Sequence, residues 1–204
     1  MYMGVGTQKT NKKWDDYLMR VAFAAAMNST CLRHSWGAVL VREKRIVSTG
    51  YNGSPSGSLN CTELGYCLKD KKKLPSGQYG IAHECHAVHA EANAIIQAGW
   101  EKAKGGTLYC MGMPCYQCAK LIVNVGITEV IYLLPYPDSK TVELFGKVGL
   151  NHLWEGPVVL RQYIPESLAI RIRGRGDGEL AILSSIKGVE PYTHCSQDDE
   201  KPLP

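Results

Sequence analysis

No stretch of the sequence approaches the about 20 consecutive apolar residues that a membrane-spanning helix requires. The apolar run Val21–Met27 is short and is preceded by Asp15, Asp16 and Arg20. No clear small-residue cleavage site follows it, which disfavours a secretion signal. We therefore expect this run to form the buried face of a first helix, in a cytoplasmic protein that has no membrane partner.

A dense stripe of basic residues is missing as well. The formal net charge is +4, and the basic clusters Lys71–Lys73 and Arg171, Arg173 and Arg175 lie far apart in the sequence. Domains dedicated to nucleic acids usually gather their lysines and arginines on one face. The charge pattern therefore predicts no nucleic-acid partner, which disfavours an enzyme that edits tRNA or DNA.

The sequence has no internal repeat, and its 204 residues fit one domain with a substantial core. Residues 1–12 are polar and are expected to form a flexible N-terminus. Residues 13–161 form the expected domain, which includes a polar, cysteine-bearing insertion at about 57–86. Residues 162–204 form a C-terminal extension whose acidic end is expected to be disordered.

Periodic apolar positions predict an α/β protein with a mixed sheet and helices on both of its faces. The expected helices are Trp14–Ser29, His89–Gln97, Cys115–Val125 and Ser139–Val148. The expected strands are Gly37–Val41, Ile46–Tyr51, Thr107–Met111, Glu129–Leu134 and Val158–Leu160. Helices and strands alternate after an initial hairpin, and this order favours such a sheet.

Cysteine, by contrast, is plentiful, with eight residues in the chain. In a reducing compartment, metal binding or catalysis explains such a number better than structural disulfides do. The strongest signals are His89-Ala90-Glu91 and Pro114-Cys115-Tyr116-Gln117-Cys118. Either motif alone is weak, but each opens an expected helix and an expected strand separates them. Their combination predicts one shared metal site.

Cys115 and Cys118 are spaced i and i+3, so both thiolates project from one helix face. The dipole at a helix N-terminus stabilises the thiolate form that a metal needs. With His89 as a third ligand, a zinc ion keeps one coordination position open for water, as in catalytic sites. Glu91 can reach that water as a general acid and base. The alternative is a structural zinc with an indirect role for Glu91, but structural sites normally have four protein ligands.

Three segments, Gly50–Gly57, His89–Ile95 and Pro114–Lys120, together resemble the deoxycytidylate (dCMP) deaminase family, in particular its ComEB-like bacterial, archaeal and phage branch. The resemblance extends from about Trp14 to Leu160. It implies a cytidine deaminase-like three-layer α/β/α sandwich around a mixed five-stranded sheet. It also implies zinc-dependent hydrolysis of dCMP to dUMP and ammonia, which feeds thymidylate synthesis, in a homo-oligomer (dimer to hexamer) with dCTP and dTTP as effectors.

The resemblance also implies roles for residues outside the metal motifs. Asn52 matches the position that binds the sugar hydroxyl, and Ala90 and Tyr136 match residues of the nucleotide pocket. Gly53 and Ser54 match part of the regulatory triphosphate site. Two simpler interpretations stay open, because Asn-Gly is a common turn dipeptide and Tyr136 can be a surface tyrosine.

A second metal site is expected in the insertion, which has too few apolar residues to pack by itself. A metal would tie it to the first helix and to the base of the catalytic helix. Four thiolates form a closed structural site, and the resemblance implies a second zinc at Cys31, Cys61, Cys67 and Cys85. His83 and His86 compete for one position, and buried free thiols are the alternative. Relatives often have Arg at the position of His86, so its contact with substrate, metal or neither stays open.

Other functions compete with this interpretation. A deaminase of dCTP, of modified dCMP or of cytidine carries the same zinc motif. A non-enzymatic zinc-binding competence accessory protein is the alternative from another class. The presence of Glu91 beside an open ligand set favours an enzyme. The sequence does not identify the residues that bind the substrate phosphate.

Overall fold

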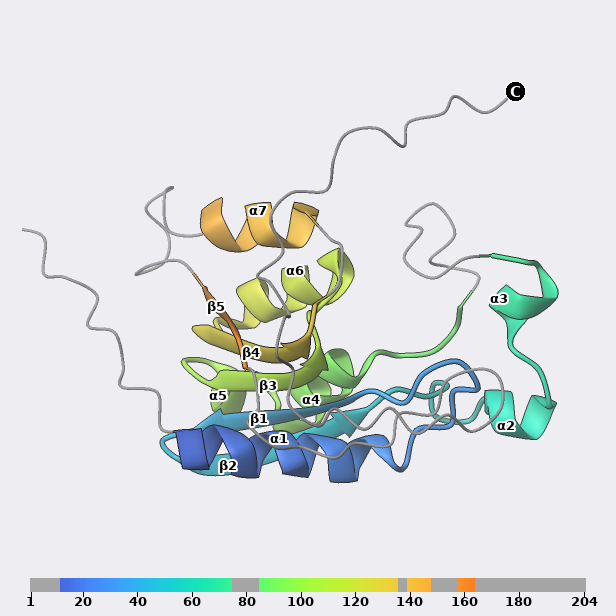
Figure 1. Ribbon diagram of the computed structural model, residues 1–204, viewed down its shortest axis with the longest axis horizontal. Helices are drawn as coiled ribbons and strands as arrows, with labels where there is room; N and C mark the ends of the chain where they lie inside the picture. The colour runs from blue at the N-terminus through green and yellow to red at the C-terminus, as the bar shows by residue number, and fades with distance from the viewer. Residues whose placement is uncertain (1–11, 75–84, 136–138, 148–157, 164–204) are drawn as a thin grey trace, which may run out of the picture.

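The computed structural model describes residues 12–74, 85–135, 139–147 and 158–163 (Figure 1). The strands are β1 (Gly37–Arg42), β2 (Arg45–Tyr51), β3 (Thr107–Gly112), β4 (Glu129–Leu134) and β5 (Val159–Gln162). The helices are α1 (Lys12–Ala26), α2 (Cys61–Leu64), α3 (Leu68–Lys71), α4 (Ala90–Ala98), α5 (Trp100–Ala103), α6 (Tyr116–Val125) and α7 (Ser139–Lys147). Tyr136, His83 and nearly all of the C-terminal extension lie outside the described residues.

The strands form one mixed sheet in the order β2-β1-β3-β4-β5. β1 runs antiparallel to β2 and β3, whereas β3, β4 and β5 are parallel to one another. The prediction of a mixed five-stranded sheet is therefore confirmed. Because β2, β3 and β4 run in the same direction, their C-terminal ends lie at one edge of the sheet, where α/β proteins usually place their ligand sites.

Helices cover both faces of the sheet, which confirms the α/β/α layering. On one face, Leu18, Met19 and Ala22 of α1 pack with Val39 and Ile131 of the sheet. The other face packs against α4, α6 and α7 through a second buried cluster, which includes Ala94, Ile122, Phe145, Leu40 and Leu108. In Figure 1, α2 and α3 stand apart from these layers, beyond one end of the sheet.

The expected elements are all present, and their bounds differ from the predicted ones by a few residues at most. Three short helices, α2, α3 and α5, were not predicted. Each has four residues, which is too short to show a period of 3.6. None of the helices in the described part of the chain is long and apolar enough to cross a membrane.

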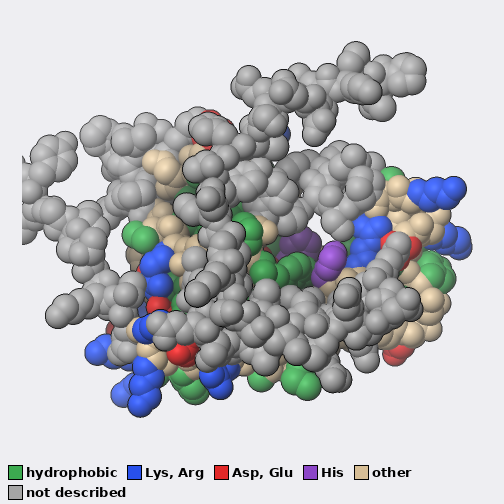
Figure 2. All heavy atoms as spheres, viewed as in Figure 1, with side chains coloured by type: hydrophobic (Ala, Val, Ile, Leu, Met, Phe, Trp, Pro, Cys, Tyr) green, Lys and Arg blue, Asp and Glu red, His purple; other side chains and the backbone are tan. Residues whose placement is uncertain are grey.

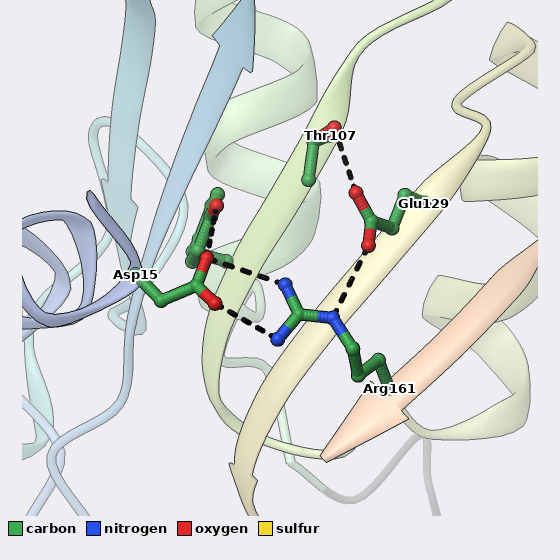
Figure 3. Close-up of polar contacts among 5 residues, drawn as sticks. Asp15, Thr107, Glu129 and Arg161 are labelled. Carbon is green, nitrogen blue, oxygen red and sulfur yellow. Dashed lines mark hydrogen bonds and ion pairs between the residues drawn. The ribbon is translucent and has the colours of Figure 1, made fainter. Parts of the chain in front are cut away.

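A charged network joins α1 to the sheet beneath it (Figure 3). The Arg161 guanidinium of β5 binds both carboxylate oxygens of Asp15, at 2.9 and 3.2 Å. It also contacts Glu129 of β4 at 3.3 Å, while the hydroxyl of Tyr109 donates to Asp15 at 2.8 Å. Only 5% of the Asp15 side chain is exposed, so this network fixes α1 against the parallel half of the sheet.

Candidate metal centre

Two of the predicted metal ligands are helix N-caps. His89 precedes α4 with φ −74° and ψ 157°, and Cys115 precedes α6 with φ −73° and ψ 165°. Both residues thus have extended backbone, and their carbonyls accept the first helical hydrogen bonds, from Asn93 and Ala119. Cys115 follows β3, so the strand end and the two helix starts bring the side chains to the same edge of the sheet.

The structure brings the three predicted ligands together. The ligand atoms of His89, Cys115 and Cys118 all lie within 4.8 Å of one another. The Nδ1 atom of His89 is 3.4 Å from the Cys115 Sγ and 3.5 Å from the Cys118 Sγ. Zinc bonds of about 2.3 Å to sulfur and about 2.0 Å to nitrogen, arranged tetrahedrally, separate the ligand atoms by about 3.5 Å. The triad therefore fits one zinc ion through Nδ1.

Hydrogen bonds within the triad shift the pKa values of its three members in different directions. The Cys118 thiol donates to Cys115 and His89 also bonds to it, which lowers the pKa of Cys115 to about 4. The bond to Cys115 raises the pKa of His89 to about 9, and the bond from Cys118 raises that thiol's own pKa. The lowered pKa of Cys115 favours its thiolate form, which is the form that binds a metal.

Glu91 lies beside the triad, in the first turn of α4. The residue is 8% exposed, and its carboxyl lies close enough to His89, Cys115 and Cys118 to interact with them. Burial raises the pKa of this carboxyl above its ordinary value. A buried carboxyl beside a metal site, with a raised pKa, suits a group that accepts and returns a proton.

The position of α4 is fixed by close packing on β2. At Gly50, a Cβ atom would overlap the backbone of Ala90 and Ala94, so the strand and the helix touch there through main chain alone. The Ser48 hydroxyl donates to the Ala94 carbonyl at 2.7 Å, and the Asn93 amide donates to the Tyr51 carbonyl at 2.7 Å. These contacts hold the helix that carries Glu91, with the ligand His89 at its start.

Asn52 lies beside the site but is mostly engaged in holding its own loop. Its Oδ1 accepts from the Trp36 amide at 2.8 Å and from the Ser29 hydroxyl at 2.7 Å, and its Nδ2 donates to the His34 carbonyl at 2.9 Å. The residue is buried, and one Nδ2 hydrogen is left for another partner. Its predicted contact with the sugar stays a prediction.

Gly53 and Ser54 continue this loop toward the segment that leads into α4. Gly53 and Val88 exchange two backbone hydrogen bonds, at 3.2 and 2.8 Å, which form an antiparallel bridge. Gly53 is buried, and the buried hydroxyl of Ser54 has no hydrogen-bond partner. Ala90, the first residue of α4, is also buried. The structure thus places all three near the metal centre without testing their predicted roles.

The charges of three other cysteines act on Cys61, in the insertion. The pKa of Cys61 is raised first by burial and then by the charges of Cys31, Cys67 and Cys85. Cys61 opens α2, and Cys67 is the N-cap of α3. Among the described residues only the triad has ligand atoms within 4.8 Å of one another, so the second site stays a prediction.

Sequence reasoning missed Lys69, on α3. Its positive charge opposes the rise of the His89 pKa, as the weakest of several contributions, although 20 positions separate the two residues. The lysine-rich run at 69–73 resembles an ordinary solvated segment, and no local pattern sets Lys69 apart from its neighbours. Only the three-dimensional path of the insertion distinguishes it.

Comparison with known families decides the affiliation. Residues 12–134, more than half of the chain, match the model of the cytidine and deoxycytidylate deaminase zinc-binding region. The chain belongs to this family. The matched region contains the triad and Glu91, so the metal centre of this cytidine and deoxycytidylate deaminase family member is a zinc centre.

Individual relatives agree with this affiliation. The chain is 40% identical over 159 residues to the deoxycytidylate deaminase of Schizosaccharomyces pombe, a match that covers 77% of this chain but 46% of that protein. It therefore spans less than half the length of the fungal protein. The deoxycytidylate deaminase of Mycobacterium phage D29 is 42% identical over 119 residues, covering 58% of this chain and 93% of the phage protein.

Among solved structures, the apo dCMP deaminase of cyanophage S-TIM5 superposes with a TM-score of 0.54. The superposition covers 74% of this chain and 98% of the phage chain, at 23% sequence identity. At 23% identity the similarity shows a shared fold, and it confirms the predicted cytidine deaminase-like architecture.

Proposed function

We propose that this protein hydrolyses the exocyclic amine of deoxycytidylate, producing dUMP and ammonia and thereby supplying dUMP for thymidylate synthesis. The observation that carries the proposal is the His89, Cys115 and Cys118 triad with the buried carboxyl of Glu91 beside it. The relatives named deoxycytidylate deaminase, at 40% and 42% identity, support the choice of substrate.

In this proposal His89, Cys115 and Cys118 hold a zinc ion. Zinc with three protein ligands lowers the pKa of a water molecule to about 7 and so supplies a nucleophile at neutral pH. Glu91 accepts one proton of the water and donates it to N3 of cytosine as the water oxygen attacks C4. Glu91 then moves the second proton to the amino group, which leaves as ammonia. Its raised pKa lets it hold each proton between these transfers.

The substrate contacts follow from the same geometry. We propose that the remaining Nδ2 hydrogen of Asn52 bonds to the sugar hydroxyl. The Ala90 amide, in the first helical turn where no intrahelical acceptor exists, bonds to the cytosine ring. Tyr136, outside the described residues, lines the nucleotide pocket in this proposal.

Regulation and assembly are also proposed. The unpartnered buried hydroxyl of Ser54, next to the bridged Gly53, supports a ligand at this loop, and dCTP and dTTP are the proposed effectors. We propose that the protein forms a homo-oligomer, from dimer to hexamer, and that it works in the cytoplasm without a nucleic-acid or membrane partner.

The proposed function is tested by measuring ammonia release from dCMP, dCTP, CMP and cytidine in parallel, with and without dCTP or dTTP as effectors. We expect the highest kcat/KM for dCMP. Removing zinc with a chelator is expected to abolish turnover, and adding zinc is expected to restore it. A higher kcat/KM for dCTP would contradict the proposed substrate. Absence of turnover with zinc bound would instead indicate a non-enzymatic zinc-binding protein.

We also propose a second, structural zinc ion, held by Cys31, Cys61, Cys67 and Cys85. The charges of Cys31, Cys67 and Cys85 act on the buried Cys61, and this interaction supports the proposal because four thiolates form a closed zinc site. The short helices α2 and α3 add support, since four-residue helices are not stable without external ties.

Metal analysis tests the second site. The wild-type protein is expected to bind two zinc ions per chain, and Cys61→Ser is expected to bind one and to unfold at lower temperature. Cys110→Ala is the matched control, because burial raises the pKa of the Cys110 thiol and makes it a poor ligand. A Cys61→Ser protein with undiminished zinc content would contradict the assignment.

A further inference from the structure

Trp36 lies immediately before β1, at the edge of the sheet where β3 ends. The antiparallel register pairs Ala38 with Cys110, and its continuation sets Trp36 opposite Gly112, the last residue of β3. The side chain packs against both buried clusters, one on each face of the sheet. Trp36 therefore lies at the end of the sheet that carries the metal centre, between the two layers of the core.

The indole ring of Trp36 occupies the space into which a side chain of residue 112 would point. A Cβ atom at Gly112 would lie 3.2 Å from Cζ3, 3.4 Å from Cη2 and 3.5 Å from Cε3 of the ring. Carbon atoms prefer separations of about 3.5–4.0 Å, so a methyl group there would displace the ring. The strand end is itself fixed, because the Met113 amide donates to the Leu134 carbonyl at 2.8 Å. The ring thus rests on the segment that leads to the ligand Cys115.

The backbone of Trp36 orients the side chain of Asn52. The Trp36 amide donates to Asn52 Oδ1 at 2.8 Å, and the Asn52 amide donates to the Trp36 carbonyl at 3.2 Å. The Asn52 Nδ2 atom donates to the His34 carbonyl at 2.9 Å, and the rings of His34 and Trp36 pack with centroids 5.7 Å apart. Because a backbone N–H can only donate, it fixes the oxygen of the Asn52 side chain on its own side and leaves Nδ2 as the donor for a ligand.

Trp36 thus connects two parts of the site through one residue. Its backbone orients Asn52, and its ring rests on the strand end before Cys115. Asn52 is 4% exposed, so its position depends on these protein contacts more than on water. Histidine and hydrophobic side chains lie next to one another on the side of the molecule toward α2 and α3 (Figure 2). A change in the size of the ring is therefore expected to shift Asn52 relative to the metal centre.

We propose that Trp36 is a positioning residue, which sets the distance between the Asn52 amide and the metal centre and so positions the sugar of the substrate. The inference rests on the proposed function and on the proposed contact between Asn52 and the sugar hydroxyl. Hydrogen bonds weaken steeply when their distance and angle are changed, so a small displacement of Asn52 is enough to lose this contact. The metal ligands stay in place, because none of them bonds to Trp36.

Comparing dCMP with 2′,3′-dideoxycytidine 5′-monophosphate, which lacks the sugar hydroxyl, tests the proposal. Trp36→Phe replaces the indole with a smaller ring that reaches less far toward Gly112. It is expected to lower kcat/KM for dCMP about 3- to 10-fold, mainly through KM, because one hydrogen bond to the substrate is lost. Turnover of the dideoxy nucleotide and the zinc content are expected to stay the same.

Gly112→Ala changes the same contact from the side of the strand. Its methyl group displaces the indole and is expected to cause the same selective loss on dCMP. In Trp36→Phe/Gly112→Ala the methyl group fills space that the smaller ring leaves, so the loss is expected to be smaller than in either single variant. Trp100→Phe makes the same chemical change at a tryptophan of α5 that is 48% exposed, and it is expected to keep wild-type kcat/KM for both nucleotides.

The outcomes separate the positioning role from the proposed function. Equal losses on the two nucleotides, a lower zinc content in Trp36→Phe, or additive losses in the double variant overturn the positioning role, while wild-type turnover of dCMP upholds the function. A wild-type protein that uses both nucleotides equally well also overturns it, because Asn52 then makes no contact with the hydroxyl. A wild-type protein that deaminates neither nucleotide overturns the function and the positioning role together. A selective loss on dCMP that the double variant relieves supports both.

Discussion

Replacing Glu91 with glutamine is expected to lower kcat for deamination about 10²- to 10⁴-fold and to leave the zinc content unchanged. Glutamine has nearly the same shape as glutamate, but its amide cannot accept and return a proton. Because Glu91 is not one of the three residues whose ligand atoms converge, metal binding does not require its charge. Steady-state ammonia release together with metal analysis measures both quantities.

The control for this experiment is Glu101→Gln, which makes the same chemical change on the exposed helix α5. It is expected to retain wild-type turnover. Retained turnover in Glu91→Gln would remove the carboxyl from proton transfer. Loss of zinc together with turnover would mean that Glu91 supports the metal instead of the reaction.

Replacing Arg161 with methionine is expected to lower the free energy of unfolding by about 3–5 kcal/mol. After the substitution, the Asp15 carboxylate keeps only its hydrogen bond from the Tyr109 hydroxyl. Water cannot replace the lost partner, because only 5% of the Asp15 side chain is exposed. A buried carboxylate without its counter-charge retains the penalty of desolvation. Urea unfolding of the zinc-loaded protein, followed by circular dichroism, measures the difference.

Arg42→Met provides the comparison, because Arg42 pairs with Glu43 at 3.8 Å and the two side chains are 41% and 81% exposed. Exposed pairs of this kind contribute about 0–1 kcal/mol. In the double variant Asp15→Leu/Arg161→Met, the buried carboxylate is removed together with its counter-charge, and only the partly exposed Glu129 loses an ion pair, so much of the lost stability is expected to return. A cost for Arg161→Met as small as that for Arg42→Met would show that water reaches Asp15.

The elements that sequence predicted best are those whose signals are local. Glu129–Leu134 has the same bounds in both descriptions because a continuous apolar run defines it. The helix starts at His89 and Cys115 were located within one residue because each motif lies at a helix N-terminus. The convergence of His89, Cys115 and Cys118 followed from the motifs and from the alternation of strand and helix that connects them.

Contacts across long separations escaped prediction. Asp15 and Arg161 are 146 positions apart, and neither lies in a pattern that indicates a buried partner. Asp15 was interpreted as a charge that precedes an apolar run, whereas it is a buried acceptor of α1. Pairing between distant side chains depends on the order of strands in the sheet, which periodicity does not determine.

The insertion was the hardest segment to interpret. Its polarity predicted a loop, and the described part of it has two single-turn helices, held by Asn60 and by the Arg33–Asp70 pair. A segment without apolar periodicity takes its conformation from such ties, so its shape was beyond reach from sequence. Lys69 was missed for the same reason.

The close contact at Gly50 controls the position of the helix that carries His89 and Glu91. Since the strand meets Ala90 and Ala94 with only a hydrogen of Gly50 between them, the depth at which α4 rests on the sheet is set by main chain. A side chain at position 50 would push α4 away from the sheet. The His89 imidazole and the Glu91 carboxylate would then move away from the thiols of Cys115 and Cys118. A position outside the ligand set thus governs how well three donor atoms share a single ion.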